Sequence, residues 1–165
     1  MKSSMTLMIL ILLSACGYHL RGALQLPEAL KKIYIQGASA ELKQAITTTF
    51  RSASGSIVTN PADAGMVLNV IHEDYQRRTI SLNTDGYSNE YELIYQVTFE
   101  MLDSQGAELV AEQTVKLSKA YFNEQSSDTV LSKGNEEAVL RKGLYEQAVR
   151  SIVERTKAQL KKQIP

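Results

Sequence analysis

Hydrophobic and polar positions alternate most regularly over residues 91–102. The large residues at every second position there are Tyr91, Leu93, Tyr95, Val97, Phe99 and Met101. Because successive side chains of a strand point to opposite faces, this period predicts a strand of about twelve residues with one buried face. A turn at residues 103–106 follows, and the alternation resumes at Leu109, Ala111, Val115, Leu117 and Tyr121. The two segments together predict an antiparallel hairpin.

Two shorter β-rich segments and a helix are predicted upstream of this hairpin. Residues 31–36 predict a first strand, and residues 66–72 carry apolar side chains on both faces, which is typical of a central strand. Between them, Ser39 suits the N-cap of a helix and Gly55 suits the C′ position after its end. The apolar face of this helix would consist of Leu42, Ala45, Ile46, Phe50 and Ala53.

The C-terminal part of the chain predicts a second, longer helix. Asn135 suits its N-cap, and Glu136 and Glu137 would lie in its first turn, where carboxylates favour the helix dipole. Its apolar positions are Leu140, Leu144, Ala148 and Ile152, flanked by Tyr145, Val149 and Val153. Two polar segments remain, and we interpret residues 76–89 as a long hairpin end and residues 123–134 as a connection.

The first fifteen residues have a different character. Lys2 is followed by an apolar run over residues 5–13 and then by Ser14 and Ala15, which is the layout of a secretory signal peptide. That run is too short to span a bilayer, which needs about 20 apolar residues. Leu13-Ser14-Ala15-Cys16 resembles a bacterial lipobox, in which the cysteine is lipidated and becomes the first residue of the mature protein. The alternative is that Cys16 is an unmodified thiol near an ordinary cleavage site.

The cysteine count favours the lipobox, because Cys16 is the only cysteine of the chain and has no disulfide partner within it. The resemblance implies an N-acyl diacylglycerol group on Cys16. The next residue is Gly17 and not Asp, which in such lipoproteins implies sorting to the outer membrane. Residues 1–15 are therefore predicted to be a lipoprotein signal peptide. Residues 16–165 are predicted to be one lipid-anchored domain on the periplasmic side.

Within that domain, the element order β-α-β-β-β-α predicts an α+β fold. We expect a two-layer sandwich, with two helices packed on one face of a four-stranded mixed sheet. The whole chain has 18 basic and 18 acidic residues, and removal of Lys2 with the signal peptide leaves 17 against 18. This balance does not suit a surface that binds nucleic acid.

No pattern of catalytic or metal-binding residues stands out. His72 lies in a predicted strand without a second histidine nearby in sequence, so the spacing of metal ligands is missing. Adjacent carboxylates such as Glu73 and Asp74 point to opposite faces of a strand and do not converge on one reacting group. We predict that the protein is not an enzyme and has no catalytic residue and no metal site.

One segment resembles a known family. Cys16-Gly17-Tyr18-His19-Leu20-Arg21-Gly22 is similar to the mature N-terminus of the LPS-assembly lipoprotein LptE family, and weaker similarities lie at Asn89-Glu90-Tyr91 and over residues 133–148. The resemblance implies the same α+β fold. It also implies an outer-membrane lipoprotein that sits inside the LptD β-barrel as a plug, supports the assembly of that barrel, and binds lipopolysaccharide for insertion into the outer leaflet.

The resemblance also implies candidate site residues. Lys133 occupies a position where the family carries a basic residue linked to lipopolysaccharide binding, while a second such position falls near Thr84 and lacks a basic residue here. Arg77 and Arg78 lie close by in sequence and could substitute. The alternative for Lys133, Arg77 and Arg78 is an ordinary solvated charge. The hairpin end Thr84-Asp85-Gly86-Tyr87 is expected to contact the barrel or the ligand.

A function of another class stays open. A stand-alone outer-membrane lipoprotein that binds peptidoglycan or another envelope complex would share the lipobox, the size and the fold, because a fold does not determine a function. Partner dependence separates the two hypotheses. Recovery together with a large β-barrel favours the plug, whereas retention on purified cell wall favours the alternative.

Overall fold

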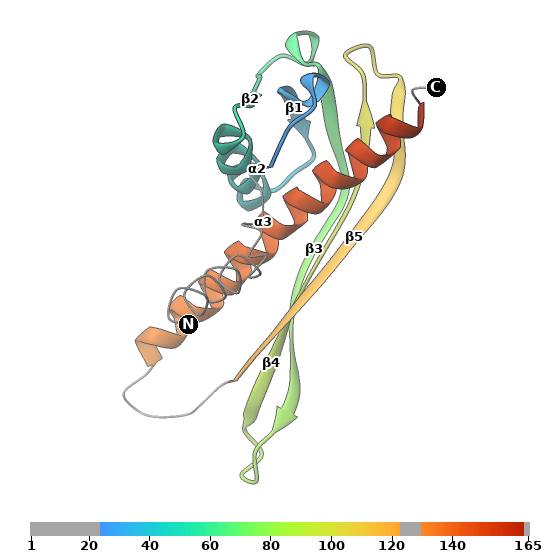
Figure 1. The fold of residues 1–165 in the computed structure, drawn as a ribbon. Coiled ribbons are helices and arrows are strands. Elements are labelled where there is room, and N and C mark those ends of the chain that lie inside the picture. The colour runs from blue at the N-terminus through green and yellow to red at the C-terminus, as the bar shows by residue number, and fades with distance from the viewer. Residues whose placement is uncertain (1–23, 123–129, 164–165) are drawn as a thin grey trace, which may run out of the picture.

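A mixed sheet forms one layer of the fold, and two helices pack on one of its faces (Figure 1). The computed structural model describes residues 24–122 and 130–163. The strands are β1 (Lys32–Gln36), β2 (Ser56–Ile57), β3 (Met66–Leu82), β4 (Ser88–Leu102) and β5 (Glu108–Phe122), and the helices are α2 (Ala40–Ser52) and α3 (Val130–Gln163). Short 3-10 turns occur at Glu28–Leu30 and Pro61–Asp63. The predicted α+β class, with both helices on one face, is confirmed.

The predicted strand count is one too low, because the sheet of the described residues has five strands in the order β2-β1-β3-β4-β5. The missed strand, β2, has two residues and pairs in parallel with β1. A segment this short cannot show an alternation of hydrophobic and polar positions, so no sequence pattern marked it.

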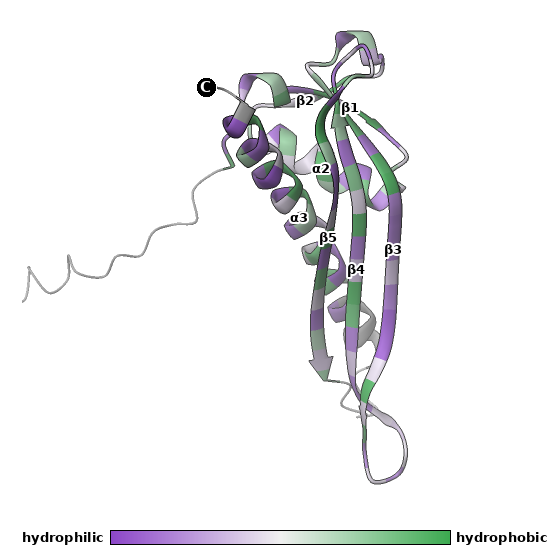
Figure 2. Ribbon diagram, turned by 90° about the vertical axis from the view of Figure 1, so that its right-hand side faces the viewer, coloured by the Kyte–Doolittle hydropathy of each residue, from purple (hydrophilic) through white to green (hydrophobic). Residues whose placement is uncertain are grey.

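Strands β3, β4 and β5 are antiparallel and much longer than the others, and we call these three strands the blade (Figure 2). The predicted long hairpin end at residues 76–89 is wrong, because β3 continues to Leu82 and β4 begins at Ser88. The intervening turn consists of residues 83–87. Polar residues occupy these strand ends because little of this part of the blade is buried, and strand formation there depends on cross-strand pairs.

A β-bulge in β3 decides which side chains face the helices. Val70 pairs with Phe99 and His72 pairs with Thr98, so Ile71 is an extra residue without a partner. Before the bulge the even-numbered residues of β3 face the helices, and after it the odd-numbered residues do. The odd-numbered residues after the bulge include Glu73, Tyr75 and Arg77, which pair with helix-facing residues of β4.

The core lies between the sheet and the two helices. The predicted buried face of β4 is confirmed, since Leu93, Tyr95, Val97, Phe99 and Met101 are all fully buried. The predicted apolar face of α2 is also confirmed: four of its five predicted residues are buried, and Ala53 is partly buried. On α3 the buried apolar residues are Leu144, Tyr145, Ala148, Val149, Ile152 and Val153, as predicted, with Leu140 partly buried beside them.

The ends of the helices differ in part from the prediction. Ser39 caps α2, because its Oγ accepts a hydrogen bond from the Leu42 backbone N–H at 3.1 Å. At the other end the left-handed residue is Ser54, with φ of 59°, and the predicted Gly55 comes one position later. The Gly55 N–H donates to the Phe50 carbonyl at 2.7 Å, so the pair completes a Schellman motif.

Helix α3 begins at Val130, five residues before the predicted N-cap at Asn135, which is wrong. The helix passes through Gly134, and a single interior glycine costs only about 1 kcal/mol relative to alanine. Helix α3 has 34 residues and is therefore about 51 Å long at 1.5 Å per residue. It crosses the sheet obliquely in Figure 1.

Candidate functional site

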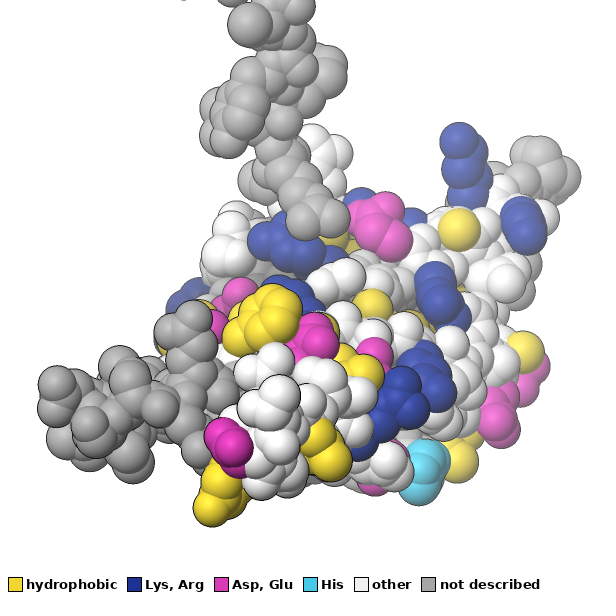
Figure 3. Space-filling model, turned by 90° about the horizontal axis from the view of Figure 1, so that it is seen from below, with side chains coloured by type: hydrophobic (Ala, Val, Ile, Leu, Met, Phe, Trp, Pro, Cys, Tyr) yellow, Lys and Arg dark blue, Asp and Glu magenta, His cyan; other side chains and the backbone are white. Residues whose placement is uncertain are grey.

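The far end of the blade carries exposed apolar side chains. Residue Glu90 of β4 pairs with Phe122, the last residue of β5, so the β3–β4 hairpin extends beyond β5. Four large apolar residues at this end are between 47% and 65% exposed, and we call them the tip: Ile80, Leu82, Tyr87 and Phe122. Figure 3 views the molecule from this end and shows hydrophobic side chains lying among polar and charged ones.

The predicted barrel-contact residues form the turn of this hairpin. Thr84, Asp85, Gly86 and Tyr87 are all exposed. The side-chain oxygen of Asn83 accepts hydrogen bonds from the backbone N–H groups of Asp85 and Tyr87, at 3.0 and 2.9 Å. Gly86 has φ of +81°, a value that favours glycine. The turn is therefore held in one shape by hydrogen bonds to the Asn83 side chain, and it presents Tyr87 to solvent.

Adjacent positions in β3 place Arg77 and Arg78 on opposite faces of the blade. Arg77 faces the helices, and its Nη1 lies 2.9 Å from Glu137 Oε2. Arg78 lies on the open face, and its Nε is 2.6 Å from Oε2 of Glu92, its cross-strand partner. The sequence suggested one site containing both arginines, but each has its own carboxylate on its own side of the sheet.

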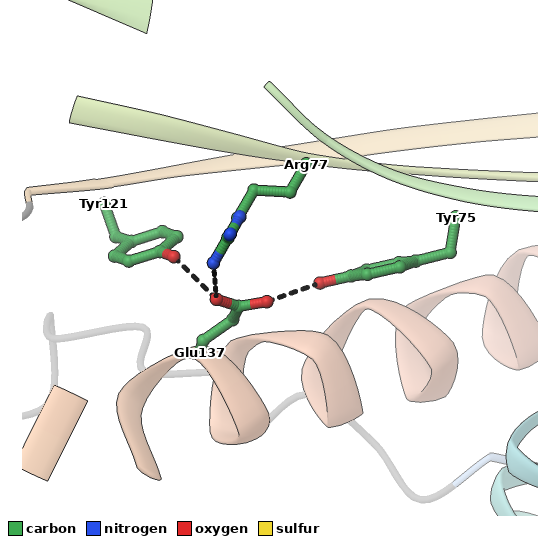
Figure 4. A network of polar contacts seen from close by, with 4 residues as sticks. All are labelled: Tyr75, Arg77, Tyr121 and Glu137. Atoms are coloured by element: carbon green, nitrogen blue, oxygen red, sulfur yellow. Dashed lines mark hydrogen bonds and ion pairs between the residues drawn. The ribbon is translucent and has the colours of Figure 1, made fainter. Parts of the chain in front are cut away.

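Glu137 is the centre of a polar network between the blade and α3 (Figure 4). Its carboxylate accepts hydrogen bonds from Tyr121 at 2.8 Å, from Arg77 at 2.9 Å and from Tyr75 at 3.3 Å. The Arg77 guanidinium also lies 4.9 Å above the ring of Tyr91, within the range of a cation–π contact. The network fastens the first part of α3 to β3 and β5.

The network changes the ionisation of its members. Burial alone would raise the pKa of Glu137, but hydrogen bonds from Tyr121 and Arg77, the charge of Arg77 and the hydrogen bond from Tyr75 outweigh it and lower that pKa. Burial and the hydrogen bond to Glu137 raise the pKa of Tyr121 to about 12. Glu137 is thus a carboxylate at neutral pH, and Tyr121 is a neutral donor.

A second carboxylate, Glu73, fastens α2 in a similar way. It accepts hydrogen bonds from the backbone N–H of Ser39 at 2.9 Å, from Ser39 Oγ at 2.7 Å and from Tyr95 Oη at 3.0 Å. Sequence reasoning gave Glu73 no specific role and placed Glu137 only as a first-turn carboxylate of its helix. The bulge at Ile71, which turns Glu73 toward the helices, has no signal in the sequence, and the partners of Glu137 lie 16 to 62 residues away.

Two candidate residues remain, Lys133 and Cys16. Lys133 is within α3, one helical turn before Glu137, and does not precede the helix as predicted. Its side chain and Cys16 lie outside the part of the chain that is described. Within residues 24–122 and 130–163, no group of three or more His, Cys, Asp or Glu side chains is placed to hold a metal ion. In the same residues, no helix combines the length and apolar character needed to cross a membrane.

The sequence is similar to those of known proteins over most of its length. Residues 30–156 match the model of the family described as LptE, Lipopolysaccharide-assembly. The LPS-assembly lipoprotein LptE of Yersinia enterocolitica serotype O:8 / biotype 1B is 27% identical over 143 residues, which are 85% of this chain and 67% of that protein. The protein of the same name from Photorhabdus laumondii is 25% identical over 142 residues, or 85% of this chain and 76% of that protein.

Two solved lipoprotein structures are similar to this chain in both fold and sequence. The solution NMR structure of the uncharacterized lipoprotein B from Nitrosomonas europaea has a TM-score of 0.67 and 26% identity, and the match covers 88% of this chain and 96% of that chain. The crystal structure of the rare lipoprotein B from Shewanella oneidensis has a TM-score of 0.61 and 26% identity, with 77% and 94% covered. The resemblance noted in the sequence is confirmed: this chain belongs to the LptE family of lipopolysaccharide-assembly lipoproteins.

Proposed function

We propose that this protein is the lipoprotein partner of the LptD β-barrel, which it plugs and whose assembly it supports, and that it binds lipopolysaccharide for insertion into the outer leaflet. In this proposal the protein has no catalytic role. It is held at the outer membrane by lipid on Cys16, with its folded domain on the periplasmic side and inside the barrel lumen. The sequence relatives are LPS-assembly lipoproteins, which supports the first part of the proposal.

The observation that carries the plug proposal is the shape and surface of the blade. Strand β3 has 17 residues and β4 has 15, so each spans about 50 Å or more at 3.3 Å per residue. That length exceeds the thickness of a bilayer with its headgroups, about 40–45 Å. Within the described residues no element covers the face of the blade opposite the helices (Figure 2).

The side chains of this open face also suit a barrel lumen. Exposed polar residues predominate on it, among them His72, Gln76, Arg78, Lys116 and Ser118. The interior of a transmembrane β-barrel is polar, so a polar sheet face can lie against it without burying unmatched apolar surface. The apolar tip would then reach the far end of the lumen.

The test is co-purification of the barrel with the protein from membranes in mild detergent. Tyr87→Asp, in the turn at residues 83–87, should weaken recovery of the barrel, because a buried large apolar side chain contributes about 1.5–3 kcal/mol and each 1.4 kcal/mol is tenfold. The matched control is Ala107→Asp. Ala107 is the last residue of the other hairpin turn. In that turn the Asp103 side chain accepts hydrogen bonds from the backbone N–H groups of Gln105 and Ala107, in the same way as the Asn83 side chain does in the turn at residues 83–87.

Recovery of the barrel by wild type and by Ala107→Asp, with a clear loss in Tyr87→Asp, would support the plug. Absence of any barrel in the wild-type preparation, together with retention of the protein on purified cell wall, would replace this proposal with a stand-alone lipoprotein that binds peptidoglycan.

The lipopolysaccharide part of the proposal rests on cations near the start of α3. Lys133 lies one helical turn before Glu137 in α3, and Glu137 forms an ion pair with Arg77. Arg77 is therefore close to the same end of α3 as Lys133, on the face of the sheet that the helices cover. Arg78 lies on the other face of the blade and would have to act separately. Lipid A phosphates are anionic, and lysine and arginine are the side chains that bind phosphate most strongly.

A further inference from the structure

A groove runs along α3 on the side of strand β5. Its volume is about 740 Å³, within the usual 300–1,000 Å³ of small-molecule sites. Its polar lining residues include Gln25, Lys119, Gln147, Arg150 and Ser151. Among the described residues that line it, only Leu24 is apolar, apart from Gly143. The groove lies beside β5, whereas the Glu137–Arg77 pair joins α3 to β3.

Lys119 interrupts the apolar face of β5. The residues of β5 that face the helices include Val115, Leu117 and Tyr121, and Lys119 takes the place between Leu117 and Tyr121 where another apolar residue would fit. Its cross-strand neighbour is Leu93, which is fully buried. Lys119 itself is half-buried, so its charge is only partly solvated.

The helix accommodates this lysine with a glycine. A Cβ atom on Gly143 would lie 3.4 Å from Lys119 Nζ, so the ammonium group lies next to the place that a side chain at position 143 would take. Apart from proline, glycine is the least favourable residue in a helix interior. A position where apolar side chains would normally pack is therefore occupied by a cation and by the space that glycine leaves.

Comparison with Arg77 shows what Lys119 lacks. Both residues pair with Leu93, one from β3 and one from β5, and both face α3. Helix α3 provides Glu137 for Arg77, but it provides Gly143 for Lys119. No hydrogen bond or ion pair joins Lys119 to any residue of the described part of the chain. A partly buried charge without a partner is unfavourable, so an anion beside Lys119 would lower the free energy of this site.

Arg150 is a second cation of the groove, and the carboxylates nearby are paired with other lysines. Glu154 is paired with Lys157 at 3.1 Å, and Glu146 has Lys142 at 4.0 Å. Arg150 has no such partner among residues 24–122 and 130–163. Residues 143, 147, 150 and 154 follow the i, i+4, i+7, i+11 spacing of one helical stripe, so Arg150 lies on the same side of α3 as Gly143.

We propose that this groove binds a phosphorylated saccharide, with Lys119 and Arg150 on the phosphate and Gln25, Gln147 and Ser151 on the hydroxyl groups. Cationic side chains form strong charge-assisted hydrogen bonds with phosphate. Amide and hydroxyl side chains both donate and accept, as sugar hydroxyls require. Nearly all of the residues that line the groove end in polar or charged groups, which suits a sugar better than an acyl chain. The site is separate from Lys133 and Arg77 and does not depend on the plug function.

The saccharide phosphate could come from a glycolipid headgroup or from a soluble sugar phosphate, and two probes separate these sources. Full-length protein in mild detergent is titrated with purified lipopolysaccharide and with its lipid-free phosphorylated core oligosaccharide, each compared with the same material after phosphatase treatment. Binding of the lipid-free oligosaccharide identifies the headgroup alone as sufficient. Binding of lipopolysaccharide only, still dependent on phosphate, identifies a membrane-bound glycolipid as the source.

Three variants test the residues. Lys119→Gln with Arg150→Gln should weaken binding at least tenfold, at about fivefold for each of the two cations, of which Lys119 is half-buried and Arg150 exposed. Lys116→Gln is the matched control, because Lys116 lies on the same strand but on the open face, and it should change binding less than twofold. Gly143→Ala should weaken binding by placing a methyl group against Lys119 while raising the unfolding midpoint, which separates loss of the site from loss of the fold.

Wild-type affinity in the Lys119/Arg150 double variant would overturn the proposal, as would equal binding of phosphatase-treated material. If Lys133→Glu weakens lipopolysaccharide binding and the double variant does not, the groove is not a site while the proposed function stands. If the double variant loses binding and no barrel co-purifies, the groove stands without the plug.

Discussion

Replacing Glu137 by Gln should destabilise the protein by about 1–2 kcal/mol at pH 7. A hydrogen bond to a charged group contributes about 1.5–3 kcal/mol net, and Tyr121 at 2.8 Å makes the best of the three. Arg77 is 51% exposed and Glu137 27% exposed, so solvent reduces their ion pair to about 1 kcal/mol or less. The Tyr75 contact, at 3.3 Å, is long for two oxygen atoms. Glutamine keeps one acceptor oxygen, which limits the total loss.

The effect of Glu137→Gln should depend on pH in a defined direction. The folded state lowers the pKa of Glu137 below its ordinary value of 4.5, so the folded protein holds this proton less tightly than the unfolded chain. Its contribution to stability is therefore fully present above about pH 4.5 and is lost as the pH falls through the lowered pKa. The difference between wild type and Glu137→Gln should be largest at neutral pH and should narrow below pH 4.

Urea unfolding followed by circular dichroism at pH 7 and at pH 3.5 measures both quantities. Glu136→Gln is the matched control, since residue 136 is exposed and adjacent, and it should stay within about 0.5 kcal/mol of wild type. Equal stabilities of wild type and Glu137→Gln at pH 7 would refute the energetic reasoning. A difference of the same size at both pH values would refute the assignment of the carboxylate charge.

Three further predictions concern other parts of the chain. Cys16→Ala should leave the precursor uncleaved by the lipoprotein peptidase and detached from the outer membrane, and labelling with radioactive palmitate should mark the wild type only. Lys133→Glu should reduce lipopolysaccharide binding about fivefold in a direct binding assay, because an exposed cation contributes about 1 kcal/mol or less, with stability unchanged. Gly143→Ala should raise the free energy of unfolding by about 0.5–1 kcal/mol, measured in urea, since alanine is the better helix former.

The parts of the fold that were predicted correctly depend on local periodicity. On β4, residues such as Leu93, Val97 and Phe99 are buried because period two is a direct result of strand geometry. The same holds for the 3.6-residue period of α2. The errors lie where periodicity is weak or broken: the two-residue β2, the polar end of the blade, and the start of α3.

The candidate site was less predictable, because it depends on contacts between residues far apart in sequence. Arg77 and Arg78 are neighbours in sequence, so they were expected to act together, yet a strand places neighbours on opposite faces. Glu137 was interpreted as a first-turn carboxylate that favours the helix dipole. Its three donors come from β3 and β5, and no local pattern joins them to α3.

The bulge at Ile71 connects these observations. Without an extra residue in β3, a strand that turns Leu68 and Val70 into the core would turn His72 and Asp74 toward the helices as well. With the bulge, Glu73 reaches the N-terminus of α2 and Arg77 reaches Glu137 on α3, while His72 moves to the open face. One unpaired residue thus lets β3 contribute apolar side chains to the core before the bulge. After the bulge, the same face of β3 contributes polar side chains that bind both helices. The polar face that this leaves on the other side of the blade is the surface proposed to lie against the barrel lumen.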